Sequence, residues 1–243
     1  MGPDGFLEVC DTDAHMIRRI GRDGHVSTLS GRAGIGSEDG PAATARFDGP
    51  CGIAAMADGT LIIADHFNER IRRIGTDGTV TSLSPPRTPG IEFLFHGPNS
   101  VAVRPDGAIY VLERIAGRLS LLWPDQHADR IAGGGFPTYR DGHGTGAGFL
   151  EPSKLCLAPD GRVFLGDRGN HRIREVSQDG TVRTIAGGGP VGIGTGSFAD
   201  GTGATARFHH PSGVVLTPSG DLLVADSDNH RIRRIRGPAL PSP

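Results

Sequence analysis

Three features of the 243-residue sequence predict an all-β fold, a β-propeller of about five four-stranded blades. An eight-residue box recurs along the chain, a Phe-x-x-Pro motif recurs in step with it, and short apolar runs alternate with Asp-Gly and Pro turn signals. Periods of roughly 20 to 50 residues are typical of solenoids and propellers. A four-stranded sheet cannot bury its apolar faces alone, and radial stacking of like sheets buries them.

The box reads Asp-x-x-Asn-x-Arg-Ile-Arg at residues 65–72, 167–174 and 226–233, and divergent copies begin at Asp11 and Glu113. Successive boxes begin 54, 48, 54 and 59 residues apart, and the Phe of the second motif keeps the same steps from Phe47 to Phe208. The sequence therefore predicts a single domain over residues 1–243. Its five copies cover about residues 1–46, 47–94, 95–148, 149–207 and 208–243.

The second copy shows the expected strands most clearly, at residues 51–57, 60–64, 70–74 and 79–83, here called strands a, b, c and d. Asp-Gly pairs at 58–59 and 77–78 predict tight a-to-b and c-to-d hairpins, because Gly accepts the positive φ of such turns. By the same pattern the first copy lacks strand a and the last lacks strand d, which leaves eighteen strands. Strand c does not alternate cleanly, and we expect a strand covered on both faces in preference to a bulge.

The composition disfavours several function classes. The net charge is -2, and Lys154 is the only lysine, so no global basic excess points to nucleic acid. Cys10, Cys51 and Cys156 lack the spacing of a zinc site and resemble small buried apolar residues. The sequence has no signal-peptide pattern and no apolar run of membrane-spanning length. It assigns neither a compartment nor an oligomeric state.

The Pro-x-Gly before strand a, the Asp-Gly turn and the Asp-x-x-Asn-His-Arg-Ile-Arg box together closely resemble the NHL repeat family of propellers. Three linkers add Asp-Gly pairs that begin at Asp39, Asp141 and Asp200. The linker at residues 85–90 lacks this pair. The resemblance covers essentially the whole chain. Family habit favours six blades, whereas the count of copies favours five, and the missing strands and the Pro-rich tail suggest either a piece of a larger ring or a natural partial copy. Such propellers bind proteins, sense ligands, bind RNA or, in one case, act as a metal-dependent lyase, so the fold does not choose the function.

The b-to-c loops and d-to-a linkers should share one end of the blades, the top face, if strand a is innermost. The candidate binding residues of this face are His66, Asn68, Arg70, His143, His171, Arg172, His209, His210, His230 and Arg231. In the structural interpretation of the box, Asp receives backbone N–H groups, Asn takes the left-handed turn and Arg pairs across blades. The pair His209-His210 departs from the other copies, and in an extended segment only one of the two would face a given ligand.

We therefore expect a non-enzymatic binding scaffold that presents its top face and channel mouth to a protein, peptide or glycan, with no cofactor. The first alternative is a metal-dependent lyase or hydrolase. Its zinc or calcium ligands would be His66, His171 and His230, treated as equivalent repeat positions. The second alternative is RNA binding through the top-face arginines, although aromatic residues make up only 5% of the chain.

Overall fold

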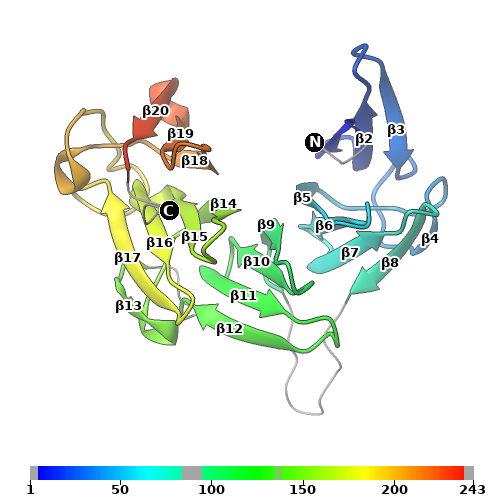
Figure 1. The fold of residues 1–243 in the computed structure, drawn as a ribbon, viewed down its shortest axis with the longest axis horizontal. Coiled ribbons are helices and arrows are strands. Elements are labelled where there is room, and N and C mark those ends of the chain that lie inside the picture. The colour runs from blue at the N-terminus through cyan, green and yellow to red at the C-terminus, as the bar shows by residue number, and fades with distance from the viewer. Residues whose placement is uncertain (1–4, 84–94, 135, 137, 238–243) are drawn as a thin grey trace. The chain divides into compact units, whose positions relative to one another are not determined.

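The computed structural model describes residues 5–83, 95–134, 136 and 138–237. Over these residues the protein forms twenty strands in five small antiparallel sheets, with four single-turn 3-10 helices and no α-helix (Figure 1). The prediction of an all-β chain of five propeller blades is confirmed. The linker at residues 85–90 and the Pro-rich tail at residues 238–243 lie outside the described residues.

The chain divides into two compact units. The first comprises the described residues of Met1–Val111 and Leu122–Ala128, and the second those of Leu112–Leu121 and Asp129–Pro243. The first unit contains a three-stranded sheet in the order β1-β2-β3 and a five-stranded sheet in the order β4-β8-β7-β6-β5. These strands are β1 (Leu7–Asp11), β2 (Met16–Ile20), β3 (Val26–Ser30), β4 (Gly40–Pro41), β5 (Pro50–Ala55), β6 (Leu61–Asp65), β7 (Arg70–Ile74) and β8 (Thr79–Leu83).

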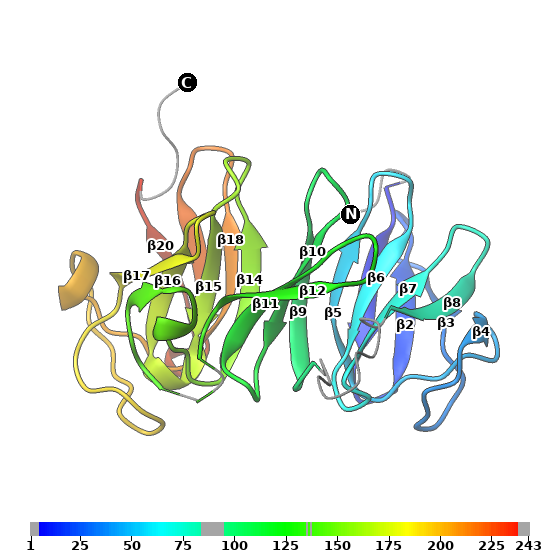
Figure 2. The ribbon, with the colours of Figure 1, turned by 90° about the horizontal axis from the view of Figure 1, so that it is seen from below.

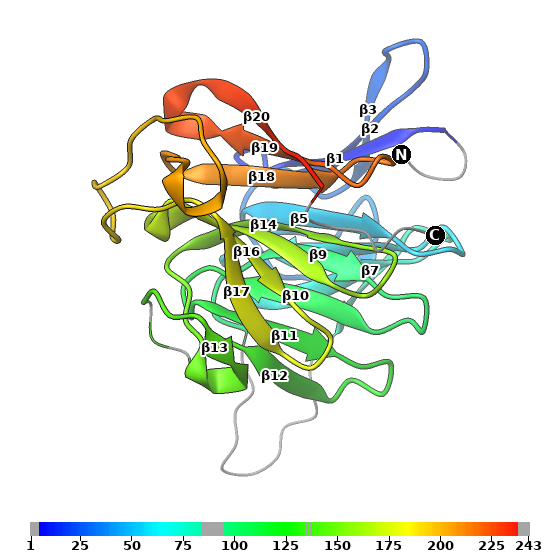
Figure 3. The same ribbon diagram turned by 60° about the vertical axis from the view of Figure 1, so that its left-hand side comes forward.

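The boundary between the units falls within the third sheet, whose order is β12-β11-β10-β9. Its strands are β9 (Pro98–Val103), β10 (Ile109–Glu113), β11 (Arg118–Leu122) and β12 (Ala128–Ala132). The second unit holds the sheets β13-β17-β16-β15-β14 and β18-β19-β20, in which β18 packs beside β14 (Figure 3). These strands are β13 (Gly142–His143), β14 (Pro152–Leu157), β15 (Val163–Asp167), β16 (Arg172–Val176), β17 (Thr181–Ala186), β18 (Pro211–Leu216), β19 (Leu222–Asp226) and β20 (Arg231–Ile235).

All eighteen expected strands are present, and the first and last blades are three-stranded, as predicted. Two further strands, β4 and β13, contain two residues each and come from linkers. Gly40 of β4 pairs with Val80 of β8, and Gly142 of β13 pairs with Val182 of β17. Each of these two linkers therefore contributes a short outer strand, which pairs with strand d of the following blade.

Strand c combines the two explanations for its broken alternation. Strands β11 and β16 are buried along their whole length, as expected of a strand covered on both faces. The pairing of β16 with β17 also shifts register between Ile173 and Arg174, whereas β7 pairs with β8 in continuous register. A bulge therefore accompanies the burial in some blades and is absent in others.

The linker phenylalanines anchor the blade cores. Phe47 packs with Ala45, Ile74 and Val80 in one buried cluster, and Phe208 packs with Ala206 and Val224 in another. Burial of a phenylalanine side chain stabilises a fold by roughly 1.5–3 kcal/mol, so these residues tie the linkers to the sheets. The three cysteines lie in the described residues, form no disulfide there and are partly buried.

Candidate functional site

The b-to-c loops and the linkers meet at one end of the sheets within each unit. Phe67 N–H donates to the carbonyl of Asp48, Gly169 N–H to that of Leu150 and Asp228 N–H to that of His209. Each bond joins a b-to-c loop to the linker residues just before strand a. In the second unit, the long linker between β17 and β18 projects from the sheets (gold in Figure 2). We call this end of the blades the loop face.

The aspartate that recurs at the first position of the box is the centre of a buried network. Asp65 Oδ1 accepts the Asp48 N–H at 2.8 Å, and its Oδ2 accepts Asn68 Nδ2 at 2.9 Å and Arg72 Nη1 at 2.7 Å. Asp65 and Arg72 are both fully buried. The same bonds recur around Asp167 and around Asp226.

The network also clamps the linker that precedes each box. Asn68 donates to the Gly36 carbonyl at 2.7 Å, and Arg72 Nη2 donates to Asp39 Oδ1 at 2.7 Å. Equivalent bonds join Asn170 and Arg174 to residues 138–141, and Asn229 and Arg233 to residues 197–200. The box side chains thus bond within the fold, in agreement with the structural interpretation, and both amide hydrogens of Asn68 are used.

The left-handed residue of the box is the one after Asn, not Asn as expected. The φ angles are +56° at His15, +54° at Glu69, +57° at His171 and +53° at His230. Gly117 occupies this position in the third box with φ +59°. The Asn side chain must reach back to the Asp and the linker carbonyl, so the reversal of the chain falls on the next residue.

His66, His171 and His230 are consequently not equivalent positions. His66 is the second residue of its box, whereas His171 and His230 are the fifth. His66 Nδ1 lies 3.1 Å from the Pro98 carbonyl, and its ring packs edge-on against Phe67. His230 is exposed. Within the described ranges, none of the three belongs to a group of three or more side chains placed to hold a metal ion.

His143 is not on the loop face as predicted: it is exposed on β13, where it pairs with Thr181 beside the c-to-d hairpin at the opposite end of the blade, and Gly144 N–H donates to the Gly180 carbonyl. The other predicted residues, three arginines, lie on the loop face of their own unit. Arg70 Nη1 donates to the Ser37 carbonyl at 3.3 Å. Arg172 stacks over Tyr139 at 4.3 Å, and Arg231 stacks over Phe198 at 4.1 Å. The three arginines therefore hold linker segments, and their part in ligand binding stays a prediction.

Three histidines come together in the second unit. The ring centroids of His171, His209 and His210 lie 4.8–5.5 Å apart. The expectation that His209 and His210 point to opposite sides is wrong, because the segment is not extended: His210 has φ +49°. Glu151, Gly49 and Gly97, which also precede a proline, share this left-handed conformation. Both histidine side chains consequently approach Asp228.

The His171 ring bonds to the backbone of the neighbouring His210. Its Nδ1 accepts the His210 backbone N–H at 3.1 Å, so its Nε2 carries the proton that it shares with the Gly192 carbonyl at 3.0 Å. Burial lowers the pKa of His171 from 6.5, and the neighbouring His210, His209 and Arg172 add to the effect. Both ring nitrogens are therefore engaged, and the ring is held neutral.

Asp228 joins the other two histidines. Its Oδ2 lies 2.6 Å from His210 Nδ1 and 3.7 Å from His209 Nε2. The hydrogen bond with His210 lowers the pKa of Asp228, and both nearby imidazoles contribute. His210 Nε2 is buried and has no hydrogen-bond partner among the described residues. We call His209, His210 and Asp228 the histidine cluster.

The histidine cluster has the donor set of a divalent metal site. One ligand atom from each residue falls within 4.8 Å of the others, and no further such group occurs in the described ranges. A metal-binding histidine usually bonds to a carboxylate or carbonyl through one ring nitrogen and to the metal through the other. His210 has this arrangement, because its Nδ1 bonds to Asp228 and its Nε2 has no partner among the described residues. Asp228 was missed from the sequence. Its signal was an Asp at box position three, where the other well-preserved boxes have Phe67 and Gly169.

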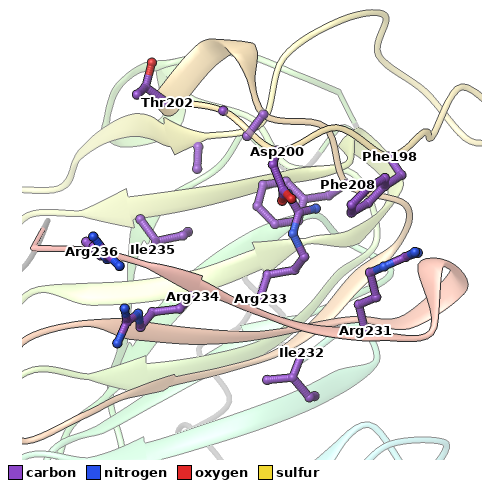
Figure 4. A pocket seen from close by; sticks show the side chains of 14 residues that line it. Phe198, Asp200, Thr202, Phe208, Arg231, Ile232, Arg233, Arg234, Ile235 and Arg236 are labelled. Atoms are coloured by element: carbon purple, nitrogen blue, oxygen red, sulfur yellow. The ribbon is translucent and has the colours of Figure 1, made fainter.

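A pocket of about 630 Å³ lies beside β20 in the second unit (Figure 4). Phe198, Asp200 and Phe208 line one part of it, and Arg233 points toward Asp200 across it. Elsewhere, the part of the chain that the structure describes has no helix with the length and apolar character needed to cross a bilayer.

The repeated sheets, the buried box network and the linker clamps define a β-propeller. The family model of the NHL repeat matches residues 149–175 and 208–235. NHL repeat-containing protein 2 of Bos taurus is 30% identical to this chain in an alignment that covers 93% of this chain. Teneurin-m of Drosophila melanogaster is 28% identical in an alignment that covers 96% of this chain. The chain belongs to the NHL-repeat β-propeller family. It spans 36% of the length of NHL repeat-containing protein 2 and 8% of Teneurin-m.

Solved structures share the fold at low sequence identity. An auxiliary nutrient binding protein from Bacteroides ovatus superimposes with a TM-score of 0.74 at 18% identity, over 96% of this chain and 57% of that chain. A virginiamycin B lyase from Staphylococcus aureus gives a TM-score of 0.62 at 15% identity, over 99% of this chain and 69% of the lyase. These similarities establish the fold and leave the function open.

Proposed function

We propose that this chain is a non-enzymatic binding scaffold whose loop face holds a protein, peptide or glycan partner. The observation that carries the proposal is the distribution of exposed large apolar side chains. Of the eleven in the described residues, seven lie in b-to-c loops or linkers: Ile35, Phe67, Ile115, Phe136, Val191, Ile193 and Phe198. Exposed apolar side chains that gather on one surface mark interaction sites.

The second unit carries five of these seven residues, and two are especially exposed. The relative exposure is 81% for Phe136 and 59% for Ile193. The box side chains of the same end bond within the fold, so partner recognition falls to the linkers, where the copies differ. A nutrient-binding protein with this fold supports the proposal of a binding function. A lyase has the same fold, so the fold alone does not distinguish binding from catalysis.

The proposal is tested by selecting binders from a random peptide display library and a glycan array. We expect enriched binders on the native chain and their loss on the variant Phe136→Ser/Ile193→Ser, because hydrophobic anchors dominate such interfaces. Val215→Ser is the matched control, since Val215 is 54% exposed but lies on strand β18. Equal enrichment on the native chain and the double variant, or no enrichment at all, contradicts the proposal.

A second candidate function is metal-dependent chemistry, and the unpartnered His210 Nε2 favours it. Zinc suits the imidazole and carboxylate donors of the histidine cluster better than calcium, which prefers oxygen. We expect one zinc ion per chain by calorimetric titration and at least about tenfold weaker binding to His209→Ala. His143→Ala, an exposed histidine outside the cluster, is the control. Equal zinc affinity in the native chain and His209→Ala excludes the site.

A further inference from the structure

Two arginines of the loop face share one carboxylate in the second unit. Arg114 Nη2 donates to Glu151 Oε2 at 3.0 Å, and Arg168 Nη1 donates to the same oxygen at 2.9 Å. Arg114 lies in the loop between β10 and β11, Arg168 in the loop after β15, and Glu151 directly before β14. We call these three residues the charged triad. They belong to the third and fourth blades, each of which has all four of its strands.

Both arginines replace shorter side chains at the second position of the box. Thr12 holds this position in the first copy and donates its hydroxyl to the Pro50 carbonyl at 2.9 Å. His66 holds it in the second copy and lies against the Pro98 carbonyl. These two side chains bond to backbone at the start of the next blade. The arginines bond instead to a glutamate that the second, third and fifth copies lack, so the triad is a departure from the repeat.

Glu151 occupies a backbone position that favours glycine. Its φ is +45°, and the corresponding residues Gly49 and Gly97 have φ angles of +59° and +62°. Glycine takes this conformation freely, whereas a residue with a side chain is strained in it. The conformation is held by the preceding residue, because the Leu150 N–H donates to buried Asp167 at 2.8 Å. Strain held in this way is typical of functional sites, and here it places a carboxylate between two guanidinium groups.

The two guanidinium groups keep most of their hydrogen-bonding capacity. Each has five N–H donors, and within the described residues Glu151 is the only hydrogen-bond partner of either group. The side chains are 40% exposed for Arg114 and 30% exposed for Arg168, so a ligand can reach them. Burial alone would raise the pKa of Glu151, but the bonds and charges of the two arginines outweigh it and lower the pKa. The triad therefore holds two cations and one anion at neutral pH.

The surroundings of the triad add an apolar contact and a second acid. Ile115 follows Arg114 in the same loop and is 57% exposed. The charge of Arg168 also reaches Asp228, whose pKa is lowered mainly by its hydrogen bond with His210. That bond gives Asp228 a partner of its own at 2.6 Å. A pair of cations beside an exposed apolar side chain suits a peptide that carries an acid next to apolar residues.

We propose that Arg114 and Arg168 bind a carboxylate side chain of an acidic peptide partner, and that Glu151 is the internal carboxylate with which this partner competes. The inference rests on the proposed binding function of the loop face and adds the chemistry of the partner. Arginine binds carboxylates through paired, charge-assisted N–H groups. Loss of Glu151 should therefore favour an acidic peptide, and loss of the two arginines should remove the preference for an acid.

The first part of the test selects peptides from a random display library on three forms of the full chain. These are the native chain, Arg114→Gln/Arg168→Gln and Glu151→Gly. Peptides selected on the native chain should be enriched in Asp and Glu over the input library. The enrichment should disappear on Arg114→Gln/Arg168→Gln, because glutamine carries no charge. It should increase on Glu151→Gly, because glycine accepts the left-handed backbone and removes the competing carboxylate.

The second part measures affinity by fluorescence anisotropy. The most enriched acidic peptide is compared with a copy that has Gln for Glu and Asn for Asp. The native chain should bind the acidic peptide at least about fivefold more tightly. The two peptides should bind equally to Arg114→Gln/Arg168→Gln, and the difference should widen on Glu151→Gly.

Arg130→Gln/Arg183→Gln is the matched control. Arg130 of β12 and Arg183 of β17 are exposed arginines of the same two blades, so this variant removes the same charge away from the triad. It should keep the native preference for the acidic peptide. Thermal unfolding of each variant checks that the chain is folded.

The outcomes separate this inference from the proposed function. Selected peptides without an excess of acids, or equal affinity of the native chain for the acidic and amide peptides, overturn the inference and leave the binding function standing. A preference for the acidic peptide that Arg114→Gln/Arg168→Gln retains places the acid elsewhere and also overturns the inference. Absence of any selected peptide overturns both.

Discussion

His171 shows how one residue can serve the fold at a position that looks like a ligand site. Its left-handed backbone ends the box turn, and both ring nitrogens bond to neighbouring backbone. His15 takes the same backbone conformation in the first unit, where its Nδ1 accepts the Gly49 N–H at 3.0 Å. His15 and His171 therefore each join consecutive blades, and the residues left for binding are those that differ between copies.

The lowered pKa of His171 makes stability depend on pH. The His171 imidazole binds a proton less tightly in the folded chain than in the unfolded chain, where its pKa is near 6.5. The contribution of His171 to the free energy of unfolding is therefore fully present above pH 6.5 and is lost as the pH falls below that value. We expect urea unfolding to show a stability loss between about pH 7 and about pH 5 that is smaller in His171→Asn. Asn tolerates the left-handed backbone and does not titrate.

The matched control for this prediction is His143→Asn, which changes an exposed histidine on β13. It should keep the native pH dependence. An identical pH dependence in the native chain and His171→Asn would show that His171 does not titrate differently in the folded and unfolded chains.

At the scale of elements, the sequence predicted the strands well because apolar runs and Asp-Gly turns are local signals. It also predicted the structural use of the box Asp and Arg. It missed β4 and β13, which depend on a linker meeting the following blade, more than 35 residues away in the pairing of Gly40 with Val80. The His209–His210 prediction failed because the residue before Pro211 takes the left-handed conformation, which a histidine does not signal in the way that Gly49 and Gly97 do at the same position.

The linker clamp is the element that should dominate blade stability. Arg72 is fully buried and binds both Asp65 and Asp39. Arg72→Met leaves Asp65 buried beside no cation, so we expect a loss of about 3–5 kcal/mol in the free energy of unfolding. Denaturant titration of the native chain and the variant measures it.

Arg73→Met is the control for the clamp, because Arg73 is the exposed neighbour on the same strand. Its effect should stay within about 0.5 kcal/mol. If the two variants lose equal stability, the clamp is not the source of the stabilisation.

At the scale of the whole molecule, three of the five blades repeat one internal network, around Asp65, Asp167 and Asp226, and the chemistry that varies lies in the loops and linkers. The chain corresponds to about a third of NHL repeat-containing protein 2, so any partner of a longer protein would meet this chain through surfaces that its own blades expose. The loop face is one such surface.

Hydrogen–deuterium exchange of the chain with its best library-selected peptide tests the central claim most directly, because it locates the bound surface without assuming it. Protection should appear in the linker between β17 and β18 and in the loop after β15, which form the loop face of the second unit. Protection confined to the hairpin turns at Gly161, Gly180 and Gly220, at the other end of these sheets, would contradict a binding loop face.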